Sequence, residues 1–376
     1  MTSSSLSTDP TIDTTSTAVT PELVLAALRE IRDPDLHQDI VTLGMIKDLT
    51  ITPASEGSHV AFTFELTTPA CPVRNQFESA AREAVMALPG VSSVDVNMSA
   101  QVRRSEGRGS AHQLELPGVK HVIAVGSGKG GVGKSTVSAN LAVALAQAGA
   151  SVGLLDADVY GPSVPQLMGI HEGIRAEEGK MVPNQAHGVS LISLGFIAGD
   201  KPVMWRGPMI GHALKQMLED VKWGDLDYLV VDLPPGTGDA QISLVQLIPL
   251  TGVIIVSTPQ HVALGIATKA LQMFRQLHVP ILGMVENMSS FCCPNCGHEL
   301  EVFGDGGVRL ASESMKVPFL GAIPLNPALR ESGDAGVPVA SFAPDSVEAA
   351  AFDSVARKVA AQISIRTQRT IPLVMQ

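Results

Sequence analysis

The sequence lacks the features that would mark an exported scaffold or a nucleic-acid-binding protein. Its 376 residues include only four cysteines, too few for a disulfide-stabilised secreted domain. The formal net charge of −11 argues against a protein that binds nucleic acid by neutralising many phosphates. Aromatic residues (4%) and charged residues (17%) are scarce, whereas glycine and proline are abundant, a balance typical of layered α/β proteins.

Two further absences concern membranes and export. The longest apolar runs, near residues 229–231 and 252–256, have the length of a β-strand and not that of a membrane span. The first twenty residues have neither the basic nor the apolar region of a secretory signal. We therefore expect a cytoplasmic protein without membrane or nucleic-acid partners, whose cysteines are thiols or metal ligands.

The first hundred residues divide into a tail and a small domain. Residues 1–20 are mostly Ser and Thr with few large apolar side chains, which predicts a disordered tail. Residues 21–100 follow the pattern helix, strand, strand, helix, strand, which predicts a small α+β domain. Within it, residues 60–66 alternate between apolar and polar side chains, as expected for a half-buried strand.

The amount and pattern of apolar residues change after residue 100. Residues 101–118 have little apolar content, which predicts a flexible linker whose arginines lie in a solvated hinge. Residues 119–365 contain short, continuous apolar runs that alternate with helical segments, which predicts one doubly wound α/β domain with a mostly parallel sheet. Residues 366–376 are predicted to be a C-terminal tail. The segment 363–370 is short and β-prone, which argues against a basic amphipathic helix at this end.

A phosphate-binding loop follows the first of these apolar runs. Positions 126–136 read GSGKGGVGKST and satisfy the pattern G-x-x-x-x-G-K-[ST] between a strand and a helix. The glycines allow backbone N–H groups to approach phosphate oxygens, and the N-terminus of the next helix favours an anion. Lys134 is expected to contact the β- and γ-phosphates, and Ser135 to bind Mg²⁺. The predicted nucleotide-binding residues of the loop are Gly128, Lys129, Gly130, Gly131, Val132, Gly133, Lys134, Ser135 and Thr136.

Acidic residues follow two later strands. Asp156 and Asp158 come after the apolar run 152–155, and Asp232 after the run 229–231. Because the carboxyl ends of parallel strands meet at one edge of the sheet, these carboxylates should lie in the ligand crevice. Asp232 is expected to hold Mg²⁺, directly or through water. Asp239 is predicted to cap the next helix at its N-terminus.

Three of the four cysteines lie between positions 292 and 296, where Cys293 and Cys296 form a C-x-x-C pair. One pair supplies two thiolates, but a tetrahedral zinc or a cubane iron–sulfur cluster requires four ligands. Three interpretations remain open from the residues alone. They are a [4Fe–4S] cluster shared by two subunits, a structural zinc with Cys292 and His298 or across a dimer, and a redox dithiol.

The loop GKGGVGKST resembles the deviant Walker A motif of the dimeric ATPases that include the nitrogenase iron protein and the MinD and ParA ATPases. The resemblance implies a homodimer that encloses two ATP molecules, with Lys129 reaching the nucleotide of the partner. It also implies that Asp158 orients the attacking water, so that Lys129, Lys134 and Asp158 are the expected catalytic residues. Asn287 resembles the family's contact to the adenine edge, and ATP is therefore favoured over GTP.

A longer set of motifs resembles the Mrp/ApbC-type iron–sulfur cluster carrier ATPases. It comprises DADVYGPS, DLPPGTGD and ENMSSFCCPNCG together with the loop, and it covers about two-thirds of the chain. The resemblance implies that Cys293 and Cys296 bind a bridging, labile [4Fe–4S] cluster that is passed to apo-proteins. Residues 21–100 resemble the Fe–S assembly domain that is often fused to these carriers. Cys71 lies there beside Pro72 at the predicted start of a helix, where a thiolate is stabilised, so it is either a reactive thiol or an inert one.

The sequence therefore predicts a homodimeric ATPase with ATP, Mg²⁺ and a [4Fe–4S] cluster, and with apo iron–sulfur proteins and an upstream assembly scaffold as partners. One alternative is a MinD- or ParA-like spatial organiser, which would need a basic or amphipathic surface helix. Another is an ATPase with a structural zinc. An electron donor like the nitrogenase iron protein is disfavoured, because its cluster cysteines lie in two separate segments.

Overall fold

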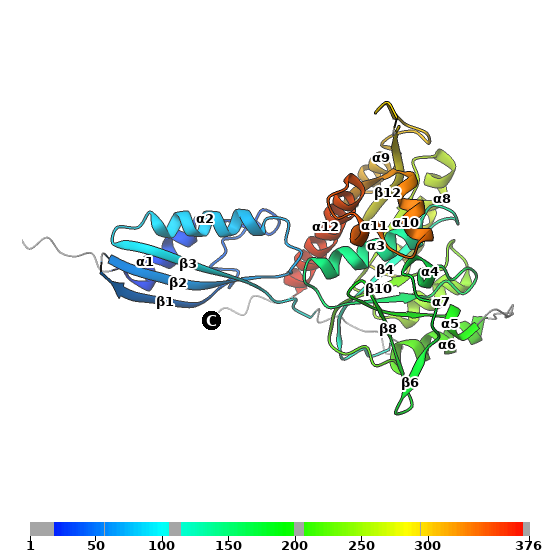
Figure 1. The fold of residues 1–376 in the computed structure, drawn as a ribbon, viewed down its shortest axis with the longest axis horizontal. Helices are drawn as coiled ribbons and strands as arrows, with labels where there is room; N and C mark the ends of the chain where they lie inside the picture. Colours follow the sequence, from blue (N-terminus) through cyan, green and yellow to red (C-terminus); the bar gives the residue numbers. More distant parts are fainter. Residues whose placement is uncertain (1–18, 56, 105–113, 199–206, 294, 371–376) are drawn as a thin grey trace, which may run out of the picture. The chain divides into compact units, whose positions relative to one another are not determined.

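The computed structural model describes residues 19–55, 57–104, 114–198, 207–293 and 295–370. The predicted tail, except its last two residues, and the central part of the predicted linker lie outside these ranges. The chain forms two compact units (Figure 1). The small unit comprises Met1–Leu66 and Val73–Ala100, and the large unit comprises Thr67–Pro72 and Gln101–Gln376.

The small unit is a three-stranded sheet with two helices, as predicted. Its elements are α1 (Pro21–Leu28), β1 (Ile46–Ala54), β2 (Gly57–Leu66), α2 (Arg74–Met86) and β3 (Val91–Ala100). The central strand β2 pairs antiparallel with β1 and parallel with β3. The alternating side chains Val60, Phe62, Phe64 and Leu66 are buried, and the rings of Phe64 and Phe77 stack with centroids 5.3 Å apart. The predicted half-buried strand is therefore confirmed.

The large unit contains a twisted sheet with the strand order β13-β12-β11-β4-β10-β5-β9-β8, and β14 pairs with β12. The predicted continuous apolar runs form six buried strands that are parallel to one another. They are β4 (Val119–Ser127), β5 (Val152–Asp156), β10 (Leu226–Asp232), β11 (Gly252–Ser257), β12 (Ile281–Cys292) and β14 (Phe319–Leu325). The predicted doubly wound, mostly parallel fold is confirmed.

Several short strands were not predicted. One of them, β9, lies parallel to β5 and extends the sheet, and β8 and β13 add antiparallel strands at its two edges. A separate hairpin is formed by β6 and β7. The bounds of these strands are β6 (Arg175–Glu177), β7 (Lys180–Val182), β8 (Asn184–Ala186), β9 (Val189–Ser193) and β13 (Glu299–Leu300).

Helices cover both faces of the large sheet. Alternate residues of β4 belong to different cores: Ile123 and Val125 pack with α3 and α12, whereas Val122 and Ala124 pack with α6, α7 and α8. Figure 1 shows α3 and α12 side by side on one face. The helices are α3 (Lys134–Gln147), α4 (Val164–Leu167), α5 (Gly195–Ala198), α6 (Gly207–Glu219), α7 (Asp239–Leu247), α8 (His261–Gln276), α9 (Gly307–Ser314), α10 (Pro327–Asp334), α11 (Val339–Phe342) and α12 (Val347–Thr370).

The prediction of a C-terminal tail from residue 366 is wrong, because α12 continues to Thr370. Ile363 and Thr367 are buried one turn apart, and the Arg366 guanidinium donates a hydrogen bond to the Ile281 carbonyl at 2.7 Å. Tertiary packing therefore overrides the β propensity of this segment, which is only a weak preference. Among the described residues, the helices are all too short or too polar to span a lipid bilayer.

The ends of the predicted linker are attached to the large unit. Val102 and Leu116 are buried, and the Arg104 guanidinium donates hydrogen bonds of 3.0 Å to the carbonyls of Leu116 and Pro117. The exposed Arg104 is therefore held against the large unit, and the solvated hinge stays a prediction. Arg108 lies outside the described residues.

Candidate nucleotide site and cysteine knuckle

The phosphate-binding loop lies at the carboxyl edge of the sheet, between the end of β4 and the start of α3. Gly131 and Gly133 have φ angles of +78° and +77°, a left-handed conformation that favours glycine. A Cβ on Gly130 or Gly131 would meet no atom within 4 Å, whereas one on Gly128 would lie 2.6 Å from the backbone of Ile266 in α8. The loop is therefore packed against α8 on one side and open on the side where a phosphate would bind.

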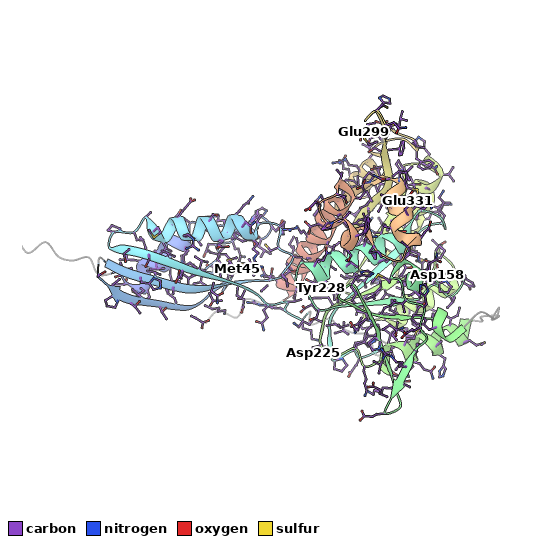
Figure 2. All side chains as sticks on the ribbon, viewed as in Figure 1. Met45, Asp158, Asp225, Tyr228, Glu299 and Glu331 are labelled. Carbon is purple, nitrogen blue, oxygen red and sulfur yellow. The ribbon has the colours of Figure 1, made fainter. Side chains whose placement is uncertain are left out.

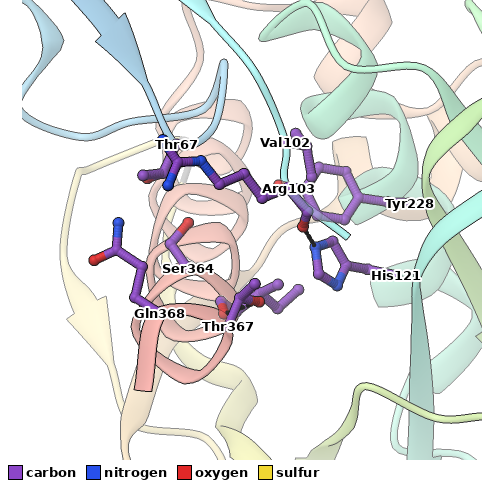
Figure 3. Close-up of a pocket in the computed structure, with 9 residues that line it drawn as sticks. Thr67, Val102, Arg103, His121, Tyr228, Ser364, Thr367 and Gln368 are labelled. Carbon is purple, nitrogen blue, oxygen red and sulfur yellow. Dashed lines mark hydrogen bonds between the residues drawn. The ribbon is translucent and has the colours of Figure 1, made fainter. Parts of the chain in front are cut away.

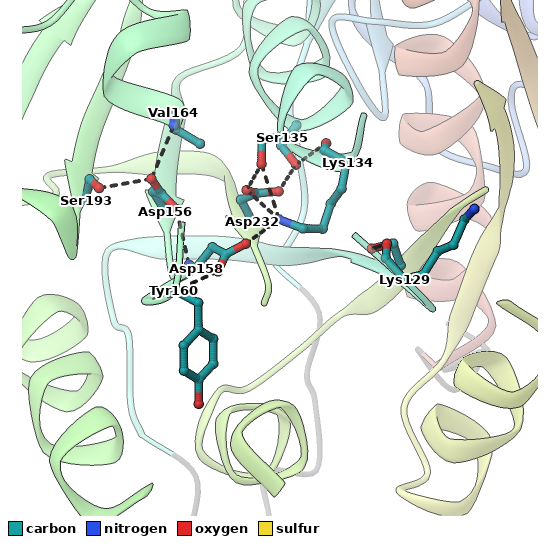
Figure 4. A network of polar contacts seen from close by, with 11 residues as sticks. Lys129, Lys134, Ser135, Asp156, Asp158, Tyr160, Val164, Ser193 and Asp232 are labelled. Atoms are coloured by element: carbon teal, nitrogen blue, oxygen red, sulfur yellow. Dashed lines mark hydrogen bonds and ion pairs between the residues drawn. The ribbon is translucent and has the colours of Figure 1, made fainter. Parts of the chain in front are cut away.

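A network of buried polar groups lies beneath the loop (Figure 4). The Lys134 ammonium donates to the Asp232 carboxylate at 2.7 Å and lies 3.6 Å from Asp158. The hydroxyls of Ser135 and Ser138 each donate to Asp232 at 2.6 Å. Strand β10 and the first turn of α3 thus bring together the lysine, the hydroxyl and the carboxylate that were predicted to bind phosphate and Mg²⁺. Oxygen ligands of this kind are the ones that Mg²⁺ prefers.

Asp156 lies beside Asp232 in the next strand, where the two residues are register partners. Its carboxylate accepts hydrogen bonds from the Ser193 hydroxyl at 3.0 Å and from the backbone N–H groups of Asp158 and Val164. Burial and the neighbouring Asp232 carboxylate raise the pKa of Asp156 to about 7, against the effect of these hydrogen bonds. Asp156 therefore shapes the turn that carries Asp158, and it is not an exposed ligand.

The two lysines of the loop point in opposite directions (Figure 4). Lys134 points toward Asp232, whereas the half-buried Lys129 points away from it and its Nζ lies 3.4 Å from the Gln260 side-chain oxygen. Lys129 therefore does not contribute to the phosphate site of its own chain in this arrangement. Figure 2 shows Asp158 at this carboxyl edge and Tyr228 at the opposite edge of the same sheet.

Asn287, predicted to contact adenine, lies on β12 directly against the loop. Its amide nitrogen donates to the Val132 carbonyl at 2.9 Å, and 6% of the residue is exposed. The contact with adenine stays a prediction. Helix α7 begins at Asp239 itself and Gly238 occupies the N-cap position, so the predicted cap is misplaced by one residue.

The C-x-x-C pair lies at the end of the hairpin formed by β12 and β13, which carries Glu299 in Figure 2. The backbone N–H of Gly297 donates to the Cys293 carbonyl, and that of Cys293 to the His298 carbonyl, both at 2.9 Å. Hydrogen bonds from the backbone N–H groups of Asn295 and Cys296, and from the Cys296 side chain, lower the pKa of the Cys293 thiol. The turn therefore favours a thiolate, the form that binds metals.

The turn that carries Cys293 and Cys296, the cysteine knuckle, provides only a partial set of metal ligands within one chain. Cys296 is exposed, and the Cys292 thiol is turned to the backbone, 3.6 Å from the Gly297 carbonyl. Throughout the described ranges, no group of three or more His, Cys, Asp or Glu side chains is arranged to hold a metal ion. A zinc bound within one chain by Cys292 and His298 together with the C-x-x-C pair is therefore not preassembled.

The sequence predicted that Cys71 lies at the start of a helix, and the structure shows that it does not. Helix α2 begins at Arg74 with Val73 at its N-cap, so that Cys71 precedes the first turn by three residues. The half-buried Cys71 belongs to the segment of the large unit that precedes α2, and its carbonyl accepts a hydrogen bond from Arg357 at 3.5 Å. The helix-dipole argument for its reactivity therefore does not hold.

A small pocket lies near this segment, at the amino edge of the sheet (Figure 3). His121 lines it, stacks on Tyr228 with ring centroids 5.9 Å apart, and is hydrogen-bonded through Nε2 to the Arg103 carbonyl at 2.8 Å. Burial lowers the pKa of His121 to about 4. His121 is therefore a neutral core residue, far along β4 from the phosphate-binding loop.

The sequence did not single out three residues that support the site. Ser138 lies one helical turn after Lys134, Ser193 ends the unpredicted strand β9, and Gln260 precedes α8. The rule that polar residues at the carboxyl ends of parallel strands face the ligand would have found Ser193 once β9 was recognised. Ser138 required only the i, i+4 spacing of a helix.

Comparison with known protein families gives a match for each part of the chain. Residues 118–360 match the family described as NUBPL iron-transfer P-loop NTPase. Residues 21–97 match the family described as iron-sulfur cluster assembly protein. The two resemblances inferred from the sequence motifs are therefore confirmed.

Individual relatives agree with these families. The chain is 48% identical over 354 residues to the iron-sulfur cluster carrier protein of Deinococcus radiodurans, covering 93% of this chain and 98% of that protein. It is 45% identical over 354 residues to the protein of that name from Synechocystis, covering 92% and 99%. Among solved structures, it resembles the nucleotide-binding protein of Archaeoglobus fulgidus in complex with ADP. That match has a TM-score of 0.54 and 40% identity, and it covers 59% of this chain and 88% of that one.

Proposed function

The chain belongs to the NUBPL iron-transfer P-loop NTPase family, and from this membership we propose that it is an ATP-hydrolysing iron–sulfur cluster carrier. Two copies would hold one [4Fe–4S] cluster between them and pass it to apo-proteins. The observation that carries the proposal is an imbalance within one chain. Lys134, Ser135 and Asp232, the groups proposed for phosphate and Mg²⁺, already contact one another, whereas the knuckle supplies only the two thiols of Cys293 and Cys296.

The nucleotide site fits Mg·ATP. The N–H groups of Gly128–Thr136 would surround the phosphates, and Lys134 would exchange its contact with Asp232 for the β- and γ-phosphates. The released Asp232 and the Ser135 hydroxyl, already within 2.6 Å of each other, would then hold Mg²⁺. Asp158, at the mouth of this cluster, would orient the attacking water, and Asn287 would lie near the adenine ring.

Lys129 supports a dimeric enzyme. Its side chain points away from the Lys134–Asp232 cluster, which supports a role at the nucleotide of a second copy. Two loops facing each other would enclose two ATP molecules. The lysine would then stabilise charge that develops on the partner's γ-phosphate, a role in which a single positioned cation has a large effect on rate.

In this proposal the iron–sulfur cluster is the group that the protein binds and transfers. Two knuckles related by a two-fold axis would supply four thiolates, which matches the ligand number of a cubane cluster. The exposure of Cys296 and the short turn favour a cluster that can leave the protein as well as bind. In the reducing cytoplasm, an upstream scaffold would load the cluster and apo iron–sulfur proteins would receive it.

The test is anaerobic reconstitution with iron and sulfide, followed by the visible spectrum. The wild-type protein should develop a sulfide-dependent chromophore with about four iron atoms per two chains. Cys293→Ala and Cys296→Ala should each lose it, whereas Cys292→Ala, the matched control in the same loop, should keep it. Uptake of zinc without any sulfide-dependent chromophore would overturn the carrier function in favour of a structural metal.

A further inference from the structure

Strand β12 runs from the amino edge of the sheet to the cysteine knuckle and touches the phosphate-binding loop on its way. Its inner half pairs with β11 as far as Glu286, and its outer end pairs with β13 at Phe291 and Cys292. Asn287 lies between these halves. Cys292 is five residues farther on, at most about 17 Å along an extended strand.

The contact with the loop is tight and buried. Asn287 donates to the carbonyl of Val132, and its amide fills the space that a side chain on Gly133 would need. The terminal methyl of Met288 also lies beside Gly133, 3.8 Å from the position of a Cβ there. The backbone at residues 132–133, where phosphate would bind, is therefore in direct contact with β12.

The strand is irregular immediately beyond this contact. Met288 has a φ angle of +57°, a left-handed conformation that costs a residue with a side chain about 1 kcal/mol. Asn287 pairs with Ile323 and Phe291 with Leu325, so β12 carries two more residues than β14 over this stretch. Such a bulge bends a strand and leaves residues outside the ladder, so that the outer end can change direction.

Residues on either side of Met288 are held. The Glu286 carboxylate accepts a hydrogen bond of 2.9 Å from the backbone N–H of Val308, in the first turn of α9. The Ser289 hydroxyl donates to the Ile323 carbonyl at 3.1 Å. A rigid inner strand, a strained residue and a projecting hairpin are the parts of a hinge.

We propose that Asn287 and Met288 link the nucleotide site to the cysteine knuckle. In this mechanism Asn287 is a positioning residue that senses the Val132 carbonyl, and Met288 is the hinge about which Phe291–Cys293 moves. Nucleotide binding alters the 132–133 backbone, Asn287 follows it, and the knuckle changes its geometry. The purpose of this linkage rests on the proposed function, but its existence does not require a cluster.

The experiment is hydrogen exchange on the cluster-free protein, with and without saturating Mg·ADP. The reporters are the amides of Cys293 and Gly297, which close the knuckle through their bonds to His298 and Cys293. In the wild type, Mg·ADP should change their exchange rates about fivefold, the effect of roughly one net hydrogen bond on a local opening equilibrium. Unchanged rates would overturn the proposal.

Two variants test the two residues separately. Asn287→Asp keeps the shape but replaces the donor by an oxygen, so the response to Mg·ADP should disappear. Met288→Gly removes the strain at the hinge, so the knuckle amides should exchange faster without nucleotide and respond less to it. Ser290→Ala, in the same bulge, is the control and should respond like the wild type.

The affinity for ADP is measured for each variant by calorimetry, so that all are compared at saturation. A full response to Mg·ADP in Asn287→Asp overturns the positioning role. If that variant no longer binds ADP, Met288→Gly decides the matter, because a wild-type response there overturns the hinge. Reconstitution with iron and sulfide is scored independently. A protein that binds only zinc contradicts the proposed function, whereas the linkage between the nucleotide site and the knuckle is still decided by the exchange rates.

Discussion

At the scale of single residues, the nucleotide site consists of opposite charges confined in the protein interior. Asp232 is fully buried and Lys134 nearly so, and the ammonium contacts Asp232 at 2.7 Å. A buried pair of this kind contributes little net stability, because desolvation offsets the attraction. Its value is positional, since it places Lys134 beside Ser135 before a phosphate and Mg²⁺ arrive.

His121 gives a pH dependence at the same scale. Burial lowers its pKa from 6.5 to about 4 in the folded protein, so the unfolded chain binds more protons between these values. Folding stability should therefore be lost as pH falls from about 6.5 to 4, by about 3 kcal/mol from this residue.

The measurement is urea unfolding of the wild type and His121→Gln at pH 7 and pH 4. Any stability advantage of the wild type at pH 7 should shrink by about 3 kcal/mol at pH 4. Comparing the two proteins at each pH removes the contribution of the carboxylates that they share. An advantage that is independent of pH would show that His121 is not held neutral by burial.

At the scale of elements, the loop between β4 and α3 uses its glycines for two different purposes. Gly128 makes room for the backbone of α8, whereas Gly130 faces open space where a phosphate would bind. Gly128→Ala should therefore destabilise the fold by about 1–3 kcal/mol through overpacking. Gly130→Ala should leave stability unchanged but weaken Mg·ATP binding about tenfold or more, because a methyl group interferes with charge-assisted phosphate contacts.

Urea unfolding and calorimetric titration with Mg·ATP separate these two effects. The two variants make the same chemical change two residues apart, so each is the control for the other. Equal effects of both on stability, or unchanged nucleotide affinity in Gly130→Ala, would contradict the assignment of the open side of the loop to phosphate.

The elements also show what could and could not be predicted from the sequence. Strands such as β10 are continuous apolar runs between turn residues, and the motif at Gly128–Ser135 is specific, so the sheet and the loop were predictable. Strand β9 was missed because VSLIS is short and mixed. The end of α12 was misjudged because its β-branched residues, such as Ile363, become helical only by packing against the sheet, and the contact of Asn287 with Val132 required three dimensions.

At the scale of the whole molecule, the two lysines of the loop predict complementation between inactive variants. Lys134→Ala loses its own phosphate contact but can still offer Lys129, whereas Lys129→Ala has the reverse defect. In a mixed dimer, the site of the Lys129→Ala subunit has every group it needs. An equal mixture should therefore recover about a quarter of the wild-type ATPase rate, since half of the dimers are mixed and one site in each is complete.

The ATPase rate of each variant alone and of the mixture is measured at one total protein concentration. Exposed Lys215→Ala on α6 is the control and should behave like the wild type alone and in mixtures. A mixture no more active than its components would mean that Lys129 does not act across a dimer.

The central claim is that two half-sites make one carrier, and native mass spectrometry of the anaerobically reconstituted protein tests it most directly. The account predicts a species of two chains that carries one [4Fe–4S] cluster, together with its loss in Cys296→Ala and its retention in Cys292→Ala. A single chain that carries a metal or cluster of its own, with no bridged dimer, would contradict the account.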